Sequence, residues 1–330
     1  MASLAADAGA TRPVELETRQ LSEGFGLEVI GVDLSRDLTP GIKQAVRDLW
    51  VQGGILLFRD AGADDEAQMR LSRIFGELEP AATADLNDPD NQFLMTLAHD
   101  PNSDVARFQR NYNVHGVDLA GWIGWHWDQS FMPTIVRGAV LRMEVPASKM
   151  GRTGFIDGIG AYDRLSPEMK QRIAALEVVY EFNPDFASGQ FGFPEDIRAL
   201  PRTTQTMKAS WDFPPVVHPL VISQVETGRK VLKLSPMHAR YVLGMDKAES
   251  DALLRELANH LVDERHAYFH QWQKNDMVVW DNWRMIHLAE GVPLDVPRRA
   301  RRTTIMGDYK VVRYLDPSLD RDRKVKRLVD

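Results

Sequence analysis

The segment from Trp122 to Asp128 contains side chains that could bind a metal ion. It reads Trp-Ile-Gly-Trp-His-Trp-Asp, so His126 and Asp128 are two residues apart. On an extended strand alternate side chains share a face, and this imidazole and this carboxylate could therefore reach one ion. Such a pair arises often by chance and is weak evidence alone. A third candidate ligand, His287, lies 159 residues after Asp128, behind a hydrophobic stretch that is predicted to be a strand.

Two histidines and one carboxylate have the composition of the facial triad of non-haem Fe(II) oxygenases. Three ligands on one face leave three positions open, two for a bidentate 2-oxo acid and one for dioxygen. The chain has no cysteine, which excludes a thiolate zinc site, a Cys-ligated iron–sulfur cluster and a cysteine nucleophile. A zinc hydrolase that uses the same three ligands and an activated water remains an alternative.

Four arginines lie between residues 297 and 303. If this segment is a strand, Arg298 and Arg302 share one face, and Arg299 and Arg301 share the other. One face must point inward, and an unpaired buried guanidinium is very costly. At least one pair is therefore expected to have an anion or an acid as its partner, and arginine is well suited to bidentate carboxylate binding. The alternative is a solvated basic edge strand.

The elements that would position these residues mix helices and strands. Helices are predicted to begin at Thr39, Asp64, Ser166 and Asp246, where capping residues precede apolar stripes of helical spacing. Strands are predicted over Ile55–Phe58, Ala139–Val145, Val216–Ile222, Met277–Trp280 and Ala300–Met306. In the second of these, apolar residues alternate as in a half-buried antiparallel strand. The pattern predicts a mainly β protein with flanking helices, built on a double-sheet jelly roll.

Composition bounds the class of protein. The 330 residues are 44% apolar and 26% charged, with a net charge of −7. This favours a folded protein over wholesale disorder and gives no sign of nucleic-acid binding or of a polybasic membrane binder. Without an apolar run near the roughly 18 residues of a membrane span, and without a signal peptide, a cytoplasmic location is the default expectation. A homo-oligomer is compatible with the sequence.

The predicted organisation is one domain with loose ends. Residues 1–13 are predicted to be a loose tail, 14–312 a single domain, and 313–330 a charged C-terminal segment. Residues 184–215 are rich in proline and predict a long, lid-like loop, although a plain surface excursion is an equal alternative. His266 and His270 are spaced like a helical metal pair, but their surroundings read better as a strand.

Taken together, these elements resemble the TauD/TfdA family, the taurine and 2,4-dichlorophenoxyacetate dioxygenases. Members are Fe(II)- and 2-oxoglutarate-dependent enzymes with a double-stranded β-helix fold. The resemblance runs from about Gly24 to Gly307 and includes Gly24–Leu34, Gly54–Arg59, Phe75–Leu78 and Ala161–Leu165.

The resemblance assigns roles to individual residues. It implies that iron is held by His126, Asp128 and His287. Thr153 and Arg298 would bind the distal carboxylate of 2-oxoglutarate, and Arg302 would lie near the oxo-acid head and the substrate. Oxidation by dioxygen would then yield succinate and carbon dioxide, and the presence of the Asp128 carboxylate disfavours halogenation. In two places the sequence departs from the family: Trp283 stands where an arginine is usual, and Arg152 replaces the second of two glycines.

The substrate follows from further departures. Taurine enzymes carry a histidine where Ala81 aligns and an asparagine where Trp122 stands, and both differences argue against taurine. Trp122 is expected to form a wall of the cavity, with a core tryptophan as the alternative. His238 resembles a histidine that helps to bind substrate in the aryloxyalkanoate branch, with a surface histidine as the alternative. The predicted substrate is a small organic acid with an apolar or aromatic body. Oxidation of an amino-acid-derived metabolite and a non-catalytic jelly-roll binding protein remain alternatives.

Overall fold

The computed structural model describes residues 14–80, 87–102, 111–183, 185–201, 213–308 and 312–322. Its largest sheet has eight strands, seven of them in one path and the eighth, β5, paired with β21. In spatial order the path is β1 (Thr18–Gln20), β2 (Leu27–Val29), β3 (Ile55–Phe58), β18 (Met277–Asp281), β9 (Gly138–Val145), β21 (Arg298–Ile305) and β4 (Leu78–Glu79); β5 spans Leu94–His99. Except for the parallel β2–β3 pair, neighbouring strands are antiparallel.

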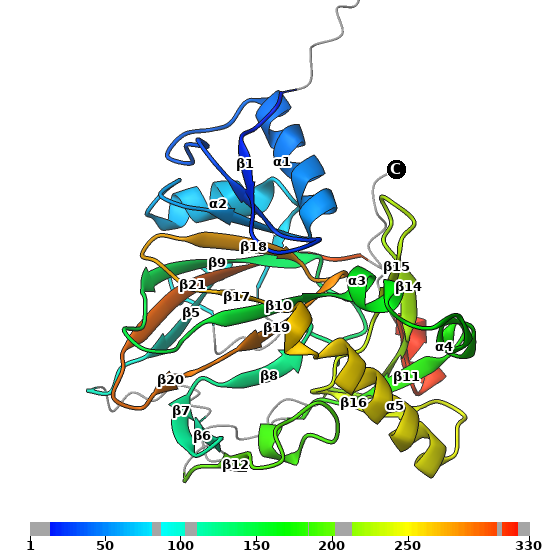
Figure 1. The fold of residues 1–330 in the computed structure, drawn as a ribbon. Helices are drawn as coiled ribbons and strands as arrows, with labels where there is room; N and C mark the ends of the chain where they lie inside the picture. The colour runs from blue at the N-terminus through cyan, green and yellow to red at the C-terminus, as the bar shows by residue number, and fades with distance from the viewer. Residues whose placement is uncertain are drawn as a thin grey trace, which may run out of the picture.

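A second, four-stranded sheet faces the large one and completes a jelly roll (Figure 1). Its order is β17 (Tyr268–His270), β10 (Thr153–Asp157), β19 (Met285–Ala289) and β8 (Ile123–His126). Leu57, Leu141 and Trp280 of the large sheet pack with Phe155 and Met285 of the small one in a shared core. The prediction of a mainly β protein with a jelly-roll core is therefore confirmed.

Three small sheets and the helices surround this core. The small sheets consist of β16 (Ala239–Val242), β11 (Glu177–Tyr180), β13 (Val216–Pro219) and β22 (Arg313–Tyr314); β12 (Arg198–Ala199), β6 (Asn111–Val114), β7 (Val117–Ala120) and β20 (Val292–Pro293); and β14 (Val221–Ser223) with β15 (Lys230–Leu232). The α-helices are α1 (Pro40–Gly53), α2 (Asp65–Arg73), α3 (Gly158–Asp163), α4 (Pro167–Ile173) and α5 (Lys247–Leu261). Short 3₁₀ turns are η2 (Phe186–Ser188), η3 (Glu264–His266) and η4 (Pro317–Asp322).

The predicted helix starts are confirmed by their capping contacts. The side chains of Thr39, Asp64, Ser166 and Asp246 each accept hydrogen bonds from backbone N–H groups of the first helical turn, in α1, α2, α4 and α5 respectively. These groups would otherwise lack partners, so the short polar residue fixes where each helix begins. The predicted strand over Val216–Ile222 is instead two strands, β13 and β14, which belong to different sheets and are separated at Leu220.

The expectation that β9 is half-buried was wrong. Its residues are buried on both faces from Gly138 to Met143. Leu141 and Met143 face the small sheet, whereas Val140 packs in the cluster formed with the N-terminal helices. In Figure 1, α1 and α2 lie over the large sheet, so its outer face is covered as well. The alternation indicated which face a side chain takes, not whether that face meets solvent.

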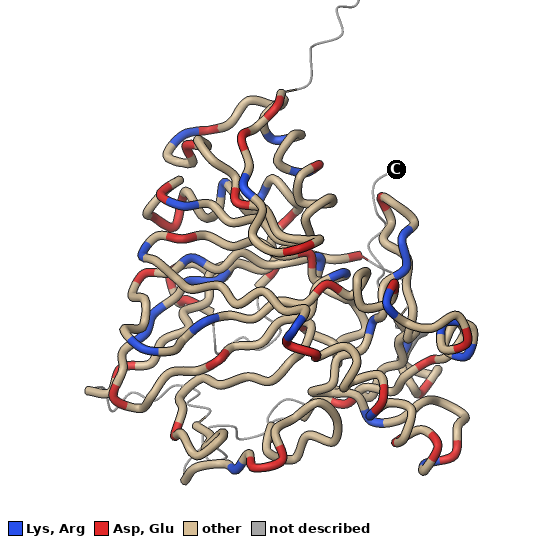
Figure 2. The backbone as a smooth tube through the Cα atoms, viewed as in Figure 1, with Lys and Arg blue, Asp and Glu red and all other residues tan. Residues whose placement is uncertain are grey.

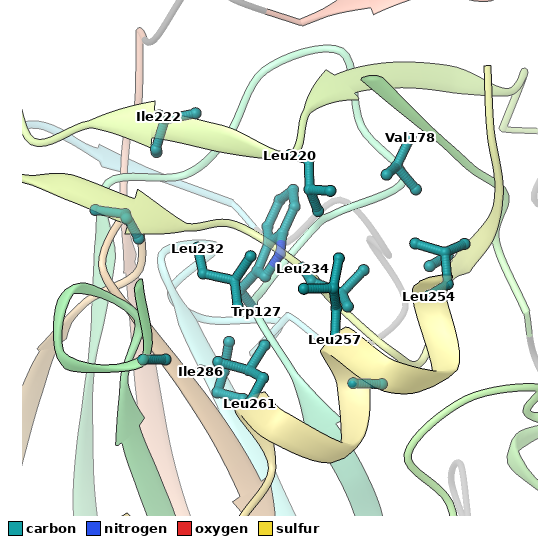
Figure 3. Packing of buried hydrophobic residues seen from close by; sticks show 14 of the residues in the cluster. Trp127, Val178, Leu220, Ile222, Leu232, Leu234, Leu254, Leu257, Leu261 and Ile286 are labelled. Carbon is teal, nitrogen blue, oxygen red and sulfur yellow. The ribbon is translucent and has the colours of Figure 1, made fainter. Parts of the chain in front are cut away.

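The largest core cluster lies beside the jelly roll, where α5 packs on the strands around it. Figure 3 shows Trp127 surrounded by Leu232, Leu234, Leu257 and other apolar side chains. Figure 2 shows acidic and basic residues interspersed along strands, helices and loops. Within the part of the chain that the structure describes, no helix combines the length and the apolar character that crossing a membrane requires.

The described parts of the two predicted peripheral segments carry ordered structure. Within 184–215, η2 and β12 form, β12 pairs with β6, and Phe186 and Phe191 are buried. Residues 184 and 202–212 lie outside the described residues, and the lid remains a prediction. At the C-terminus, Arg313 and Tyr314 pair with β13, so the sheet continues two residues beyond the expected domain end at 312.

Candidate active site

Three potential metal ligands meet at one end of the four-stranded sheet β17-β10-β19-β8 of the jelly roll, which is called the small sheet from here on. His126 ends β8 and lies directly opposite His287 of β19, and Asp128 follows two residues after β8. The Nε2 atoms of His126 and His287 lie 3.9 and 3.8 Å from Asp128 Oδ1. One ligand atom from each of the three residues falls within 4.8 Å of the others. The sheet register, which joins segments 159 residues apart, thus brings the predicted triad together.

A β-bulge in β8 determines which side chain faces the cavity together with His126. His126 pairs with His287 and Ile123 with Ala289, so two residues of β8 stand opposite Leu288 alone. A bulge reverses the alternation of side chains along its strand. Ile123 therefore lines the cavity together with His126.

The predicted position of Trp122 in the cavity wall is not met, for the same reason. Trp122 is buried and packs against Tyr112 and Phe193 in a separate cluster, and it is not among the residues lining the cavity. Strict alternation through the bulge would have put Trp122 on the face of His126. The extra residue turns it away, which makes it the core tryptophan of the alternative interpretation.

Asp128 is held through its backbone by Asn282 and through its carboxylate by Arg302. The Asp128 backbone N–H donates to Asn282 Oδ1 at 2.7 Å, and Asn282 Nδ2 donates back to the Asp128 carbonyl at 3.1 Å. Arg302 Nη2 lies 2.8 Å from Oδ2, which leaves Oδ1 turned toward the two imidazoles. Burial alone would raise the pKa of Asp128, but Arg302 and the two histidines outweigh it and lower the pKa to about 2. The carboxylate is therefore ionised at neutral pH.

The histidines are prepared to donate lone pairs. His126 Nδ1 lies 2.8 Å from the Gly124 carbonyl, which can only accept, so Nδ1 carries the proton and Nε2 is left as the ligand atom. Burial, followed by the neighbouring His126, lowers the pKa of His287 well below its usual value, which keeps this ring neutral. Two imidazoles and one carboxylate fit a non-haem Fe(II) ion.

A cavity of about 310 Å³ opens next to the triad and is lined by a partly buried arginine. Arg298, on β21, lines this cavity, and burial lowers its pKa to about 10. Within the described residues no hydrogen bond or ion pair to its guanidinium is observed. Thr153, on β10, lines the same cavity and is buried. A partly buried guanidinium that pairs with no described residue is expected to hold an anionic ligand.

Comparison with known proteins agrees with this geometry. A family model described as taurine catabolism dioxygenase TauD, TfdA family, matches residues 17–304. The chain belongs to the TauD/TfdA family. It is 30% identical to an (S)-phenoxypropionate/alpha-ketoglutarate-dioxygenase of Sphingobium herbicidovorans, over 87% of this chain and 94% of the relative. It is 27% identical to an alpha-ketoglutarate-dependent 2,4-dichlorophenoxyacetate dioxygenase of Burkholderia sp., over 89% and 95%.

A solved structure extends the comparison. AAD-2, crystallised with Mn(II) and N-oxalylglycine, superposes with a TM-score of 0.67 and 28% identity, over 91% of this chain and 100% of that one. As a TauD/TfdA member, the protein is an Fe(II)- and 2-oxoglutarate-dependent dioxygenase that also uses dioxygen. The zinc hydrolase and the non-catalytic binding protein are thereby set aside.

The two places where this TauD/TfdA sequence departs from its family lie outside the triad. Trp283 donates from Nε1 to the Ile135 carbonyl at 3.2 Å, and the guanidinium of Arg137 stacks on its ring at 4.2 Å. Arg152 forms an ion pair with Glu290 at 2.6 Å beside Thr153. Both departures alter the surroundings of the site while leaving its ligands in place.

The expected substrate residues have different outcomes in this dioxygenase. His238 is buried and lines the cavity, so the surface-histidine alternative does not hold. Ala81 lies outside the described residues. Phe131 and Phe182 also line the cavity, with ring centroids 4.7 Å apart, and sequence reasoning missed both. The position of Phe131, three residues after Asp128, could have predicted that it lies near the site. No neighbouring motif predicted the same of Phe182.

Proposed function

We propose that iron is bound by His126, Asp128 and His287, and that the distal carboxylate of 2-oxoglutarate is bound by Arg298 and Thr153. The bound iron, with dioxygen and 2-oxoglutarate, supplies the oxidising chemistry. The chain provides two imidazoles, of which His287 is held neutral by burial, a carboxylate kept ionised by Arg302, and a partly buried cation for the distal carboxylate. The observation that carries this assignment is the guanidinium of Arg298, which lines the cavity of the triad and pairs with no residue that the structure describes.

The proposed substrate is a small carboxylic acid with an aromatic or apolar body. Phe131, Phe182 and Met237 line the cavity that contains the triad. The rings of Phe131 and Phe182 also approach His238, with centroid distances of 5.1 and 5.8 Å. Aromatic faces and edges of this kind favour flat apolar groups and exclude water from the reacting carbon. The relatives that act on phenoxypropionate and 2,4-dichlorophenoxyacetate support the same class.

His238 is the proposed donor to the substrate carboxylate. Its Nδ1 accepts a hydrogen bond from the Asn183 backbone N–H at 3.1 Å. In a neutral imidazole one nitrogen accepts and the other carries the proton, so the proton resides on Nε2. His238 lines the cavity beside Phe131 and Phe182 and would thus lie close to an acidic head group at the aromatic end of the cavity.

Succinate release with a panel of acids tests this substrate class. We expect turnover with 2-phenoxypropanoate or a related aryl or alkyl acid and little with taurine, whose short polar chain gains nothing from an apolar wall. Phe131→Leu should raise the KM for the aryl acid several-fold, while the concentration of oxo acid needed for half-maximal rate changes little.

Two results of this panel would contradict the substrate class. Efficient taurine turnover would refute the apolar cavity. A clear preference for N-acyl or free amino acids would instead favour an amino-acid-derived metabolite. Either result leaves the family membership intact.

A further inference from the structure

The hydroxyl of Thr153 receives a hydrogen bond from a buried indole. Trp272 Nε1 lies 3.0 Å from Thr153 Oγ1, and both side chains are 5% exposed. An indole N–H can only donate, so the threonine oxygen must be the acceptor in this contact. The hydroxyl proton of Thr153 is then directed away from Trp272, and Thr153 lines the cavity that contains Arg298.

The position of Trp272 is fixed by the turn that follows β17. Thr153 pairs with His270 in the small sheet, which places Trp272 two residues beyond the point of pairing. The Asp276 carboxylate closes the turn by accepting from the Gln273 backbone N–H at 2.8 Å.

Asp276 is itself anchored. Its carboxylate is 3.1 Å from His270 Nε2, and it accepts from Arg59 Nη1 at 2.8 Å. The ring of His270 meets the ring of Trp272 at a centroid distance of 4.5 Å, nearly perpendicular. This buried network leaves the indole little freedom to leave the hydroxyl.

We propose that Trp272 is a positioning residue for the co-substrate: it occupies the acceptor side of the Thr153 hydroxyl, so that the hydroxyl proton is presented to the distal carboxylate of 2-oxoglutarate. This inference rests on the proposed co-substrate site. A hydroxyl that can rotate presents lone pairs to a carboxylate as readily as a proton, and lone pairs facing an anion are repulsive. Keeping the hydroxyl in the orientation that points its proton at the ligand therefore favours binding of the carboxylate, without any contact between Trp272 and the ligand.

The experiment compares two oxo acids by calorimetry on Mn(II)-loaded protein. 2-Oxoglutarate and 2-oxopentanoate have the same five-carbon chain, but only the first has a distal carboxylate. Trp272→Phe keeps a buried ring and removes the N–H, and it should weaken 2-oxoglutarate binding about 3- to 10-fold in Kd. The dissociation constant for 2-oxopentanoate should stay within about twofold, because its chain does not use the Thr153 proton.

A double-variant cycle shows whether Trp272 acts through Thr153. Thr153→Val alone should weaken 2-oxoglutarate binding about 10- to 100-fold in Kd. Adding Trp272→Phe to Thr153→Val should then change the Kd by no more than about twofold. A shape-matched replacement, 3-benzothienylalanine at position 272, puts sulfur where the N–H stands and should reproduce the effect of phenylalanine if folding of the latter is impaired.

The outcomes distinguish the role of Trp272 from the assignment of the co-substrate site on which it rests. An equal loss for both oxo acids, or full additivity with Thr153→Val, overturns the role of Trp272 while the co-substrate site stands. An unchanged affinity for 2-oxoglutarate in Thr153→Val overturns the assignment of the co-substrate site itself.

Discussion

The two faces of strand β21 carry arginines in opposite situations. On the face toward α2, Arg301 donates to Asp88 at 2.7 Å and to Asp65 at 3.0 Å, and it also bonds Thr96. On the cavity face, Arg298 is partly buried and makes no hydrogen bond or ion pair to a described residue. Arg302 lies between these extremes, because its partner is the candidate ligand Asp128.

This difference separates structural charge from functional charge. Both terminal nitrogens of Arg301 are paired, and they tie α2 and the segment before β5 to the sheet, so its role ends within the protein. The guanidinium of Arg298 carries a desolvation cost that no described side chain offsets, and in the proposed function the distal carboxylate of 2-oxoglutarate offsets it. The same residue type, three positions apart, stabilises the fold on one face and is proposed to bind a ligand on the other.

The largest expected effects come from substitutions in the candidate triad, and they exceed those of substitutions at Arg298. His126→Ala, Asp128→Ala and His287→Ala should each abolish succinate formation, because two remaining ligands hold the ion weakly. Calorimetry with Mn(II) should show lost metal binding in each variant. His260→Ala, on α5 and outside the cavity, serves as the control and should retain both properties. Full activity in any triad variant would refute the ligand set.

The comparison of the two faces predicts opposite phenotypes for matched substitutions. Arg298→Met should weaken 2-oxoglutarate binding by about 30- to 1000-fold in Kd without lowering the melting temperature, because no hydrogen bond or ion pair to a described residue is lost. Arg301→Met should leave that Kd unchanged and cost about 1–3 kcal/mol of stability. The cost stays moderate because Asp65 is partly exposed and keeps its ion pair with Arg142.

Binding titrations and thermal unfolding of both variants check this prediction. If Arg298→Met destabilises the protein as much as Arg301→Met, Arg298 is a structural residue. The division between the two faces would then be lost.

The smallest expected effect is a change in acid sensitivity on the paired face. The hydrogen bond from Arg301 is the main reason why the pKa of Asp88 lies below its ordinary value of 3.8. A lowered pKa contributes stability above the unfolded value, and the contribution is lost as the pH falls through the folded value. The difference in melting temperature between the wild type and Arg301→Met should therefore be largest near neutral pH and shrink below about pH 4. A constant difference from pH 7 to pH 3 would contradict this linkage.

Several features of the fold and of the candidate site could be predicted from short stretches of the sequence. Capping residues such as Thr39 and Asp64 mark helix starts because they satisfy N–H groups a few residues away. His126 and Asp128 are predicted together because strand spacing and ligand chemistry are written into a single short segment. The absence of cysteine likewise restricts the ligands of any metal before folding is considered.

Other features depend on contacts between distant segments. Alternation placed Trp122 on the cavity face, but the bulge in β8, visible only in its pairing with β19, turned it into the core. Taken alone, the run of arginines favoured a solvated edge strand, yet β21 has neighbours on both sides. Phe182 and Trp272 reached the site through strands that pair far along the chain.

By itself, the sequence determined which chemistry this protein could perform, because side-chain type and short-range spacing are properties of the chain. It supplied two imidazoles and a carboxylate for iron, and arginines that alternate between two faces. Only the tertiary structure decided which arginine keeps a partner and which is left for a ligand. The reason is physical: the cost of a buried charge depends on the groups that surround it in space, and those groups come from distant parts of the sequence.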